Sequence, residues 1–388
     1  MLEEPQCKAH KAEHRRGKYP AVMRRPSQSG QSCLERESVG PRSQGDYRKR
    51  YAEFLKRCRL ARLPTRTAAQ VDRALVDWMN GEFFDGGDAG EATRLLAVVR
   101  HFRPSLKAKG VLGRATQAAK GWKRLAPLKS RLPTPWEVVA AICNQLVLDG
   151  HRWAAQLAAM MFVFYLRPVD LLPMRGNQIV APLRLAGHGR WSIVLFPQER
   201  DEVSKTGEQD ESLQLDLDFY QWMGPVLAQL KARAGDEGLV ANCSYAELAR
   251  LYLAAGQKLK LPAPPTLYQL RHGGASADLA SGRRTIAGVK ARGRWHDDRS
   301  VTRYGKGGRI TEQLSRLGAR FHEHVRVLVP AIGAIPAGHL RPGGPSPRAG
   351  SPRALFGHGR LLESLARHGP WNPHHGSGRH PRALARPL

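Results

Sequence analysis

The sequence of 388 residues predicts a mainly helical α+β protein with two folded domains and one small antiparallel sheet. Apolar residues recur at helical spacing through most of the chain between 46 and 327. Two short runs, 191–196 and 212–217, have the alternation and β-branched content of strands. The two ends, 1–45 and 328–388, are polar and basic, without periodicity, and predict disordered tails.

The first domain is expected to span 46–128 and to be entirely helical. Three stretches carry apolar side chains at positions that share one face of a helix, namely 51–58, 71–79 and 95–102. A basic segment follows, and it leads into the second domain. Lysine and arginine recur along this segment at Lys120, Lys123, Lys129 and Arg131.

The second domain is expected to span 129–327, and its helices have clear start signals. Thr134 with Pro135 predicts a helix that has the threonine as N-cap and the proline at its first position. A very apolar helix follows over 153–166 and ends before Pro168. The two predicted strands are joined by a segment that contains Lys205. Two further capping boxes pair Ser244 with Glu247 and Thr266 with Gln269.

The chain is strongly basic, with 62 Lys and Arg against 33 Asp and Glu, a formal net charge of +29. Such an excess predicts a polyanionic partner, nucleic acid first and an anionic membrane surface second. The five cysteines show no paired spacing, which excludes a disulfide scaffold, disfavours a structural zinc site and fits a reducing compartment. The start has no apolar segment of the secretory type, and the longest apolar run is too short to span a bilayer.

Charged and aromatic residues stand in a fixed order along the second domain. An arginine follows the apolar helix, a lysine lies between the strands, and the last two residues, a tryptophan and a tyrosine, are nine positions apart. In order these residues are Arg167, Lys205, Tyr268, Arg271, Trp295 and Tyr304. In this order and spacing the chain resembles the tyrosine recombinases, the phage-integrase-type enzymes. It is most similar to those of eukaryotic mobile elements, which often read Gly-Arg-Trp and then Arg-Tyr.

The resemblance covers about half of the chain and implies a role for each matching residue. Tyr304 would attack phosphorus and form a covalent 3′-phosphotyrosyl intermediate. Arg167 and Arg271 would bind the non-bridging oxygens, because a guanidinium fork matches two phosphate oxygens at once. Lys205 would protonate the departing 5′ oxygen. Trp295 has only an indole N–H to donate, so it would hydrogen-bond the phosphate or pack beneath it.

Two residues beside these matches bear on how the site works. Asp170 stands where the family usually has an acidic residue that braces the first arginine. Tyr268 stands where the family has the His of His-x-x-Arg, and this is a departure from the pattern. A phenol can donate a hydrogen bond to phosphate, but it does not act as a base at neutral pH as an imidazole can. We expect His272 and His296, which flank the matching residues, to be structural.

Two readings of the catalytic-type domain therefore stay open. It is either a working DNA strand-exchange enzyme or a catalytically inactive, DNA-binding remnant of a mobile-element recombinase. A general RNA-binding protein is a more distant third reading, and we find no ribonucleoprotein motif for it.

The resemblance also implies the partners. They are double-stranded DNA, gripped partly by the basic segment 120–131, and further copies of the chain in a homotetramer on paired sites. No metal, nucleotide cofactor, membrane or small-molecule substrate is implied, and the expected location is the nucleus. The apolar stretch 321–332 resembles a helix that such enzymes lend to a neighbour. Closure of its own domain is the alternative.

Overall fold

The structure is a computed structural model that confirms the mainly helical class with a small antiparallel sheet. The residues that it describes are 38–127, 132–183, 188–200, 209–302 and 304–332, with Ser32, Leu34, Glu35 and Leu185. The chain divides into two units, 1–130 and 131–388. Most of the two predicted tails lies outside the described residues.

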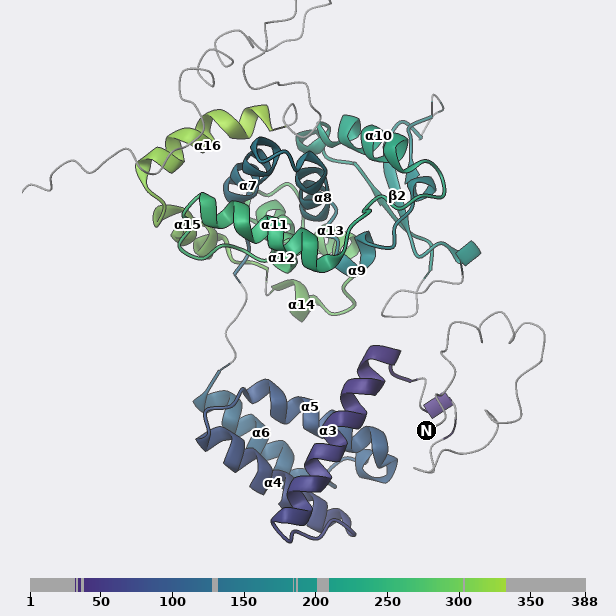
Figure 1. Cartoon of the computed structure of the whole chain (residues 1–388), viewed down its shortest axis with the longest axis vertical. Coiled ribbons are helices and arrows are strands. Elements are labelled where there is room, and N and C mark those ends of the chain that lie inside the picture. The colour runs from purple at the N-terminus through teal and green to yellow at the C-terminus, as the bar shows by residue number, and fades with distance from the viewer. Residues whose placement is uncertain are drawn as a thin grey trace, which may run out of the picture. The chain divides into compact units, whose positions relative to one another are not determined.

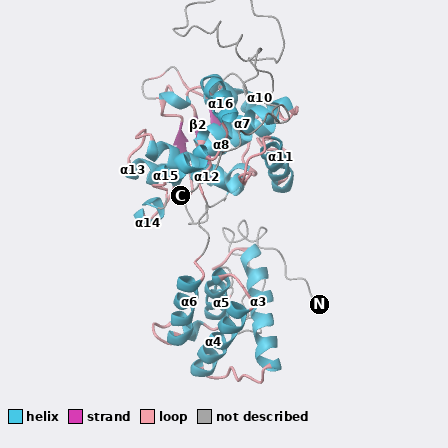
Figure 2. Cartoon of the chain, turned by 90° about the vertical axis from the view of Figure 1, so that its left-hand side faces the viewer, coloured by secondary structure: helices cyan, strands magenta, loops and turns pink. Residues whose placement is uncertain are grey.

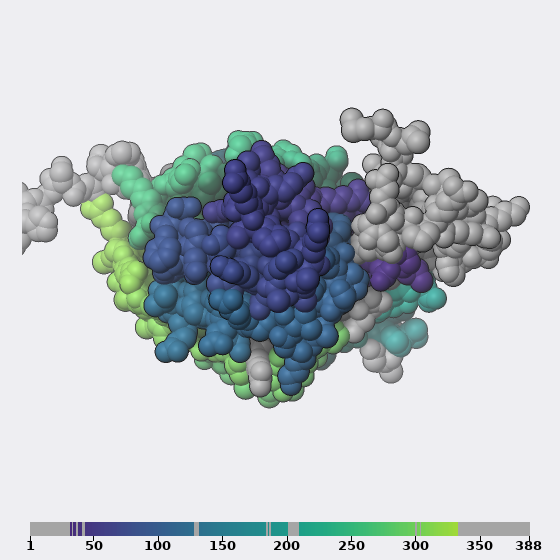
Figure 3. All heavy atoms as spheres, turned by 90° about the horizontal axis from the view of Figure 1, so that it is seen from below, coloured from purple at the N-terminus to yellow at the C-terminus, as the bar shows by residue number. Residues whose placement is uncertain are grey.

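The first unit is a set of helices, drawn purple to blue in Figures 1 and 3. Its α-helices are α3 (Pro41–Leu60), α4 (Ala68–Phe84), α5 (Ala89–Phe102) and α6 (Gly113–Leu125), with a short 3-10 helix at Pro104–Lys107. Helix α3 begins five residues before 46, so residues 41–45 are helical rather than part of a tail. The core lies between these four helices.

Helix α6 occupies part of the segment that the sequence analysis treated as a basic link. Its buried face consists of Ala115, Ala119 and Trp122, and two of these three side chains are too small to give a strong periodic signal. The buried carboxylate of Asp72 on α4 accepts hydrogen bonds from the backbone N–H groups of Arg114 and Ala115, at 3.2 and 2.8 Å. This cross-helix contact satisfies donors at the start of α6 that a helix leaves open.

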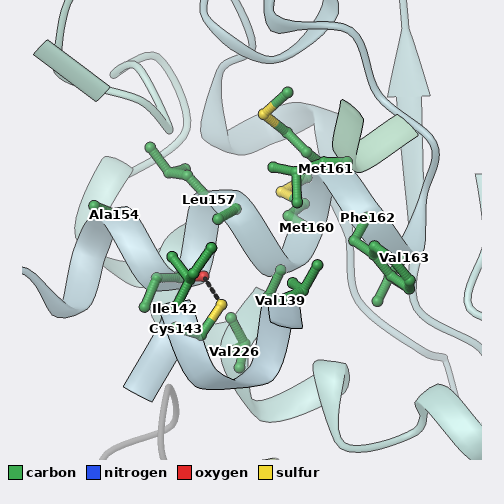
Figure 4. Packing of buried hydrophobic residues seen from close by; sticks show 14 of the residues in the cluster. Val139, Ile142, Cys143, Ala154, Leu157, Met160, Met161, Phe162, Val163 and Val226 are labelled. Carbon is green, nitrogen blue, oxygen red and sulfur yellow. Dashed lines mark hydrogen bonds between the residues drawn. The ribbon is translucent and has the colours of Figure 1, made fainter. Parts of the chain in front are cut away.

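The second unit contains most of the helices and the sheet (Figures 1 and 2). Its core forms where α7 packs against α8, with α11, α12 and α16 also against α7. Figure 4 shows the apolar side chains of α7 and α8 facing one another, with Cys143 Sγ donating to the carbonyl oxygen of Ala155 at 3.6 Å. The helices are α7 (Trp136–Leu148), α8 (Arg152–Val163), α9 (Pro168–Leu171), α10 (Met223–Ala234), α11 (Tyr245–Lys258), α12 (Leu267–Ala280), α13 (Ile286–Gly293), α14 (Asp298–Thr302), α15 (Gly307–Ser315) and α16 (Ala319–Ala331).

The start signals of the helices are partly confirmed. The box of Thr266 and Gln269 forms at the start of α12, and Ser244 Oγ accepts from the N–H of Glu247 at 3.1 Å. The prediction for α7 was wrong by one residue, because Pro135 is the N-cap. The hydroxyl of Thr134 is instead buried without a hydrogen-bond partner.

The sheet has three antiparallel strands in the order β1 (Ile179–Val180), β2 (Ser192–Leu195) and β3 (Glu211–Gln214). Strands β2 and β3 correspond to the two predicted strands, and Ile193 pairs with Leu213. Side chains of both residues are buried in the core. Strand β1 was not predicted, because two residues are too few to show alternation.

Helix α12 approaches its neighbours closely because it carries two consecutive glycines. A Cβ on Gly273 would lie 2.3 Å from the carbonyl oxygen of Thr134, and one on Gly274 would lie 2.1 Å from that of Phe162. Any larger residue would force α12 away from α8. The same helix carries Tyr268 and Arg271, two of the predicted site residues. The two glycines therefore determine how closely these residues approach α8.

Helix α16 contains most of the apolar stretch 321–332, which was expected either to be lent to a neighbouring copy or to close its own domain. Its side chains Phe321, Val325 and Leu328 are buried in the core of the second unit, and the helix packs against α7. In this structure the stretch therefore closes its own domain. None of the described helices is long and apolar enough to cross a membrane.

Candidate active site

The first predicted site residue, Arg167, lies where the chain turns from α8 into the short helix α9. Tyr165 has a positive φ of 52°, which ends α8 before the predicted position and redirects the chain. The backbone N–H of Arg167 donates to Asp170 Oδ2 at 2.9 Å, while its Nη1 lies farther from the same oxygen, at 3.8 Å. The Arg167 side chain keeps 24% of its surface exposed, so its guanidinium remains accessible to an anion.

The second arginine, Arg271, lies on α12 and is almost completely buried, with 1% of its surface exposed. Its guanidinium donates to two backbone carbonyl oxygens, those of Tyr165 and Gly293. Among the described residues no carboxylate lies within ion-pair distance of it. Arg271 thus ties the end of α8 to the end of α13 while keeping its charge unneutralised.

Trp295 and Tyr304 pack beside this guanidinium. The Arg271 guanidinium lies over the Trp295 ring at 4.6 Å from its centroid, and the Trp295 and Tyr304 ring centroids are 4.5 Å apart. Tyr304 is buried, with 7% of its surface exposed. Gly293 is required for this arrangement, because a Cβ there would lie 1.8 Å from an atom of the Trp295 ring. The Trp295 ring therefore packs against both Arg271 and Tyr304.

The Tyr268 ring is linked to the Tyr304 ring through the ring of His272. It is half-buried near the start of α12, and its ring centroid lies 5.3 Å from that of His272, one helical turn later. The His272 centroid in turn lies 4.9 Å from that of Tyr304. The structure thus places the imidazole of His272, which we expected to be structural, in contact with the ring of Tyr304. The i, i+4 spacing predicts the contact of His272 with Tyr268, but no local pattern indicated its contact with Tyr304.

A third arginine, Arg294, belongs to the same cluster and was missed by the sequence analysis. Its Nη2 donates to Asp170 Oδ2 at 2.5 Å and its Nη1 to Glu211 Oε2 at 3.2 Å. The side chain is only 7% exposed. We call Arg167, Asp170, Arg271, Arg294, Trp295 and Tyr304 the arginine–tyrosine cluster.

Positive charge dominates the arginine–tyrosine cluster. Burial, and after it the like charges of Arg167 and Arg294, lower the pKa of Arg271 to about 10. The guanidinium therefore remains charged at neutral pH, but its charged form is disfavoured by its surroundings. An anion that entered the cluster would relieve this repulsion.

A second network of tyrosine, aspartate and arginine side chains joins the arginine–tyrosine cluster at Tyr165. The hydroxyl of Tyr220 donates to Asp278 at 2.8 Å, and that of Tyr165 donates to the other oxygen of the same carboxylate. Arg284 and Arg292 both ion-pair with Asp216. Burial raises the pKa of Tyr165 well above its ordinary value, and the Asp278 charge adds to this. Tyr165 is therefore held at two points: its hydroxyl donates to Asp278, and its carbonyl oxygen accepts from Arg271.

The remaining predicted residues are distributed over both units. Lys205 lies outside the described residues, within the 201–208 gap between β2 and β3. Lys129 and Arg131 also lie outside them. Lys120 and Lys123 are exposed on α6 of the first unit. Across the described ranges, no three His, Cys, Asp or Glu side chains gather closely enough to share a metal ion.

No protein-family model matches the sequence, and no curated protein matches it. Solved structures do match. The XerA recombinase gives a TM-score of 0.36 at 14% identity, covering 70% of this chain and 98% of that chain. The XerH site-specific recombinase bound to its difH substrate before cleavage gives 0.37 at 13% identity, covering 70% and 90%. The post-cleavage complex on a palindromic difH substrate gives 0.37 at 12% identity, covering 69% and 88%.

Proposed function

We propose that the chain is a site-specific DNA recombinase that cleaves and rejoins duplex DNA through a 3′-phosphotyrosyl intermediate on Tyr304. The observation that carries this proposal is the buried guanidinium of Arg271. Within the described residues it hydrogen-bonds to carbonyl oxygens alone. It lies near a second, partly exposed arginine and shares the Trp295 ring with a buried tyrosine. Such a site is suited to a phosphodiester, because the fork of Arg167 can bind its oxygens and the buried charge of Arg271 can stabilise its negative charge.

The proposed reaction breaks one bond and forms one. The hydroxyl oxygen of Tyr304 attacks phosphorus, the bond from phosphorus to the 5′ oxygen breaks, and a 3′-phosphotyrosine forms. The phenolic proton passes to His272, whose ring is in contact with that of Tyr304. The departing 5′ oxygen takes a proton from Lys205. Rejoining is the reverse, with a 5′ hydroxyl as nucleophile, and the phosphotyrosine conserves the bond energy.

The two arginines act on the charge that develops on the non-bridging oxygens. Arg271 is rigid because both ends of its fork are bonded, and it therefore needs little reorganisation during the reaction. Arg167 is partly exposed and would complete the pair. The segment with Lys205 ends just before β3, whose first residue, Glu211, is ion-paired with Arg294 of the cluster. This anchoring supports a role for Lys205 at the site.

The proposed substrate is double-stranded DNA. Lys120 and Lys123 on α6, together with Lys129 and Arg131, would contact its phosphates. The XerH structures similar to this chain are complexes with a DNA substrate. Exchange between two duplexes requires four cleavages, so we propose a homotetramer on paired sites. If the chain belongs to a eukaryotic mobile element, its substrate would place it in the nucleus.

The decisive experiment uses a nicked duplex that releases a short strand after cleavage and so traps the covalent adduct. The wild-type chain should become linked to DNA, and Tyr304→Phe should bind the same DNA without linking. Tyr245→Phe is the matched control, because this tyrosine is half-exposed on α11 and its variant should still form the adduct. Binding without any adduct in the wild type would favour the inactive DNA-binding remnant. An adduct formed by Tyr304→Phe would refute the nucleophile.

A further inference from the structure

The backbone at Arg294 has an unusual conformation for an arginine. The residue ends α13 with φ 55° and ψ 48°, in the left-handed region. Glycine adopts this region freely, whereas a residue with a Cβ is disfavoured there. Such strain persists where the surrounding structure fixes the residue. Arg294 is fixed by its side chain, which joins carboxylates from α9 and β3.

The contacts of Asp170 show what this side chain does. One oxygen of Asp170, Oδ2, receives the Arg294 Nη2 at 2.5 Å and the backbone N–H of Arg167 at 2.9 Å. The guanidinium of Arg167 lies farther away, at 3.8 Å. The carboxylate is therefore paired with Arg294, and it interacts with the Arg167 side chain only weakly.

Asp170 would otherwise pair with Arg167. Its side chain is 2% exposed, so water cannot replace a lost partner and an unpaired charge would be costly. Among the described residues the only other guanidinium within 4 Å of it is that of Arg167. A bidentate pair between the two would occupy the fork of Arg167.

We infer that Arg294 is a positioning residue that keeps the Asp170 carboxylate away from the guanidinium of Arg167, so that Arg167 is available for the phosphate. This inference rests on the proposed function for the identity of the phosphate, but its geometry does not depend on that function. It differs from a bracing role, in which Asp170 would support the Arg167 side chain directly. The two roles predict opposite results for the loss of the Asp170 charge once Arg294 has been removed.

The test compares Arg294→Gly, Asp170→Asn and the double variant. Glycine fits the left-handed backbone, and asparagine can still accept the N–H of Arg167 through its amide oxygen. We expect Arg294→Gly to form the DNA adduct roughly ten- to a hundredfold more slowly, the factor for one hydrogen bond to a charged group. In the double variant, Asp170→Asn should recover most of that loss. A double variant as slow as Arg294→Gly, or slower, would overturn the inference.

Two further measurements separate this inference from the proposed function. Affinity for a duplex oligonucleotide should fall in Arg294→Gly and recover in the double variant, as the rate of adduct formation does. The inference can therefore be tested even if the chain binds DNA without cleaving it. A crystal structure of Arg294→Gly should show both Asp170 oxygens on Arg167, and an unchanged distance of 3.8 Å would overturn it without reference to DNA. Arg294→Lys should retain part of the activity, because an ammonium can still pair with Asp170. Thermal melting of every variant confirms that it is folded.

Discussion

Replacement of Arg271 by lysine tests whether its charge has a function beyond holding the fold together. The guanidinium donates to the carbonyl oxygens of Tyr165 and Gly293, and a lysine ammonium can reach only one of two such separated acceptors. Arg292 provides a matched control. It is also buried, and it donates to the carbonyl oxygens of Val163 and Gln214. Its guanidinium lies over the Phe164 ring and ion-pairs with Asp216.

The expected loss of stability is similar for Arg271→Lys and Arg292→Lys. One buried carbonyl loses its donor in each variant, which costs about 1–3 kcal/mol of unfolding free energy. Asp216, the ion-pair partner of Arg292, keeps its second partner Arg284. For a domain of 150–250 residues, each kcal/mol lowers Tm by about 2–4 °C. The expected loss of cleavage rate differs between the two variants. Arg271→Lys should lose a further ~2.7–4 kcal/mol of transition-state stabilisation, or about 10²–10³ in rate, as for loss of one preorganised donor.

The assay measures single-turnover adduct formation at saturating DNA, at a temperature well below the melting temperature of both variants. Circular dichroism gives the folded fraction, so that each rate refers to folded protein. We expect Arg292→Lys to cleave at close to the wild-type rate and Arg271→Lys to be nearly inactive. Equal losses in the two variants would refute the assignment of Arg271 to the phosphate and leave it as a structural tie.

Three further outcomes are expected. His272→Phe keeps the ring packing but removes the nitrogens, so it should slow adduct formation by about 10²–10⁴ without weakening DNA binding; an unchanged rate would assign the ring to packing alone. The double variant Lys120→Ala with Lys123→Ala should reduce the slope of log affinity against log salt by about 1.8, at about 0.9 per phosphate contact; an equal slope in titrations of both proteins would show that α6 does not touch DNA. Gly274→Ala should destabilise the second unit by about 1–3 kcal/mol, because its Cβ would lie 2.1 Å from the carbonyl oxygen of Phe162. Urea unfolding measures this loss. An unfolding midpoint like that of the wild type would mean that α12 moves without cost.

Local patterns predicted most helices and both longer strands, because capping residues and apolar periodicity are encoded within a few positions. The order of motifs also predicted which residues meet, since Arg271, Trp295 and Tyr304 do lie together. Helix α6 was missed because its buried face is mainly alanine.

Arg294 could not be predicted in the same way. Its partner Asp170 lies 124 positions earlier in the chain, and no local pattern links the two. Its left-handed backbone is a position where glycine is the ordinary expectation, so the sequence alone suggested no role for an arginine. The contact of His272 with Tyr304 likewise depends on how the segment after α13 folds back over α12.

The fold requires some of these site residues more than others, and this difference bears on whether the chain is an enzyme or a remnant. Arg271 holds two backbone carbonyls, so a non-catalytic protein would keep it for stability alone. Arg167 is different, because its side chain is partly exposed and the nearby buried carboxylate is already paired with Arg294. A chain released from catalysis has little structural reason to keep an arginine at this position. The presence of Arg167 therefore favours the enzyme over the remnant more strongly than the presence of Arg271 does.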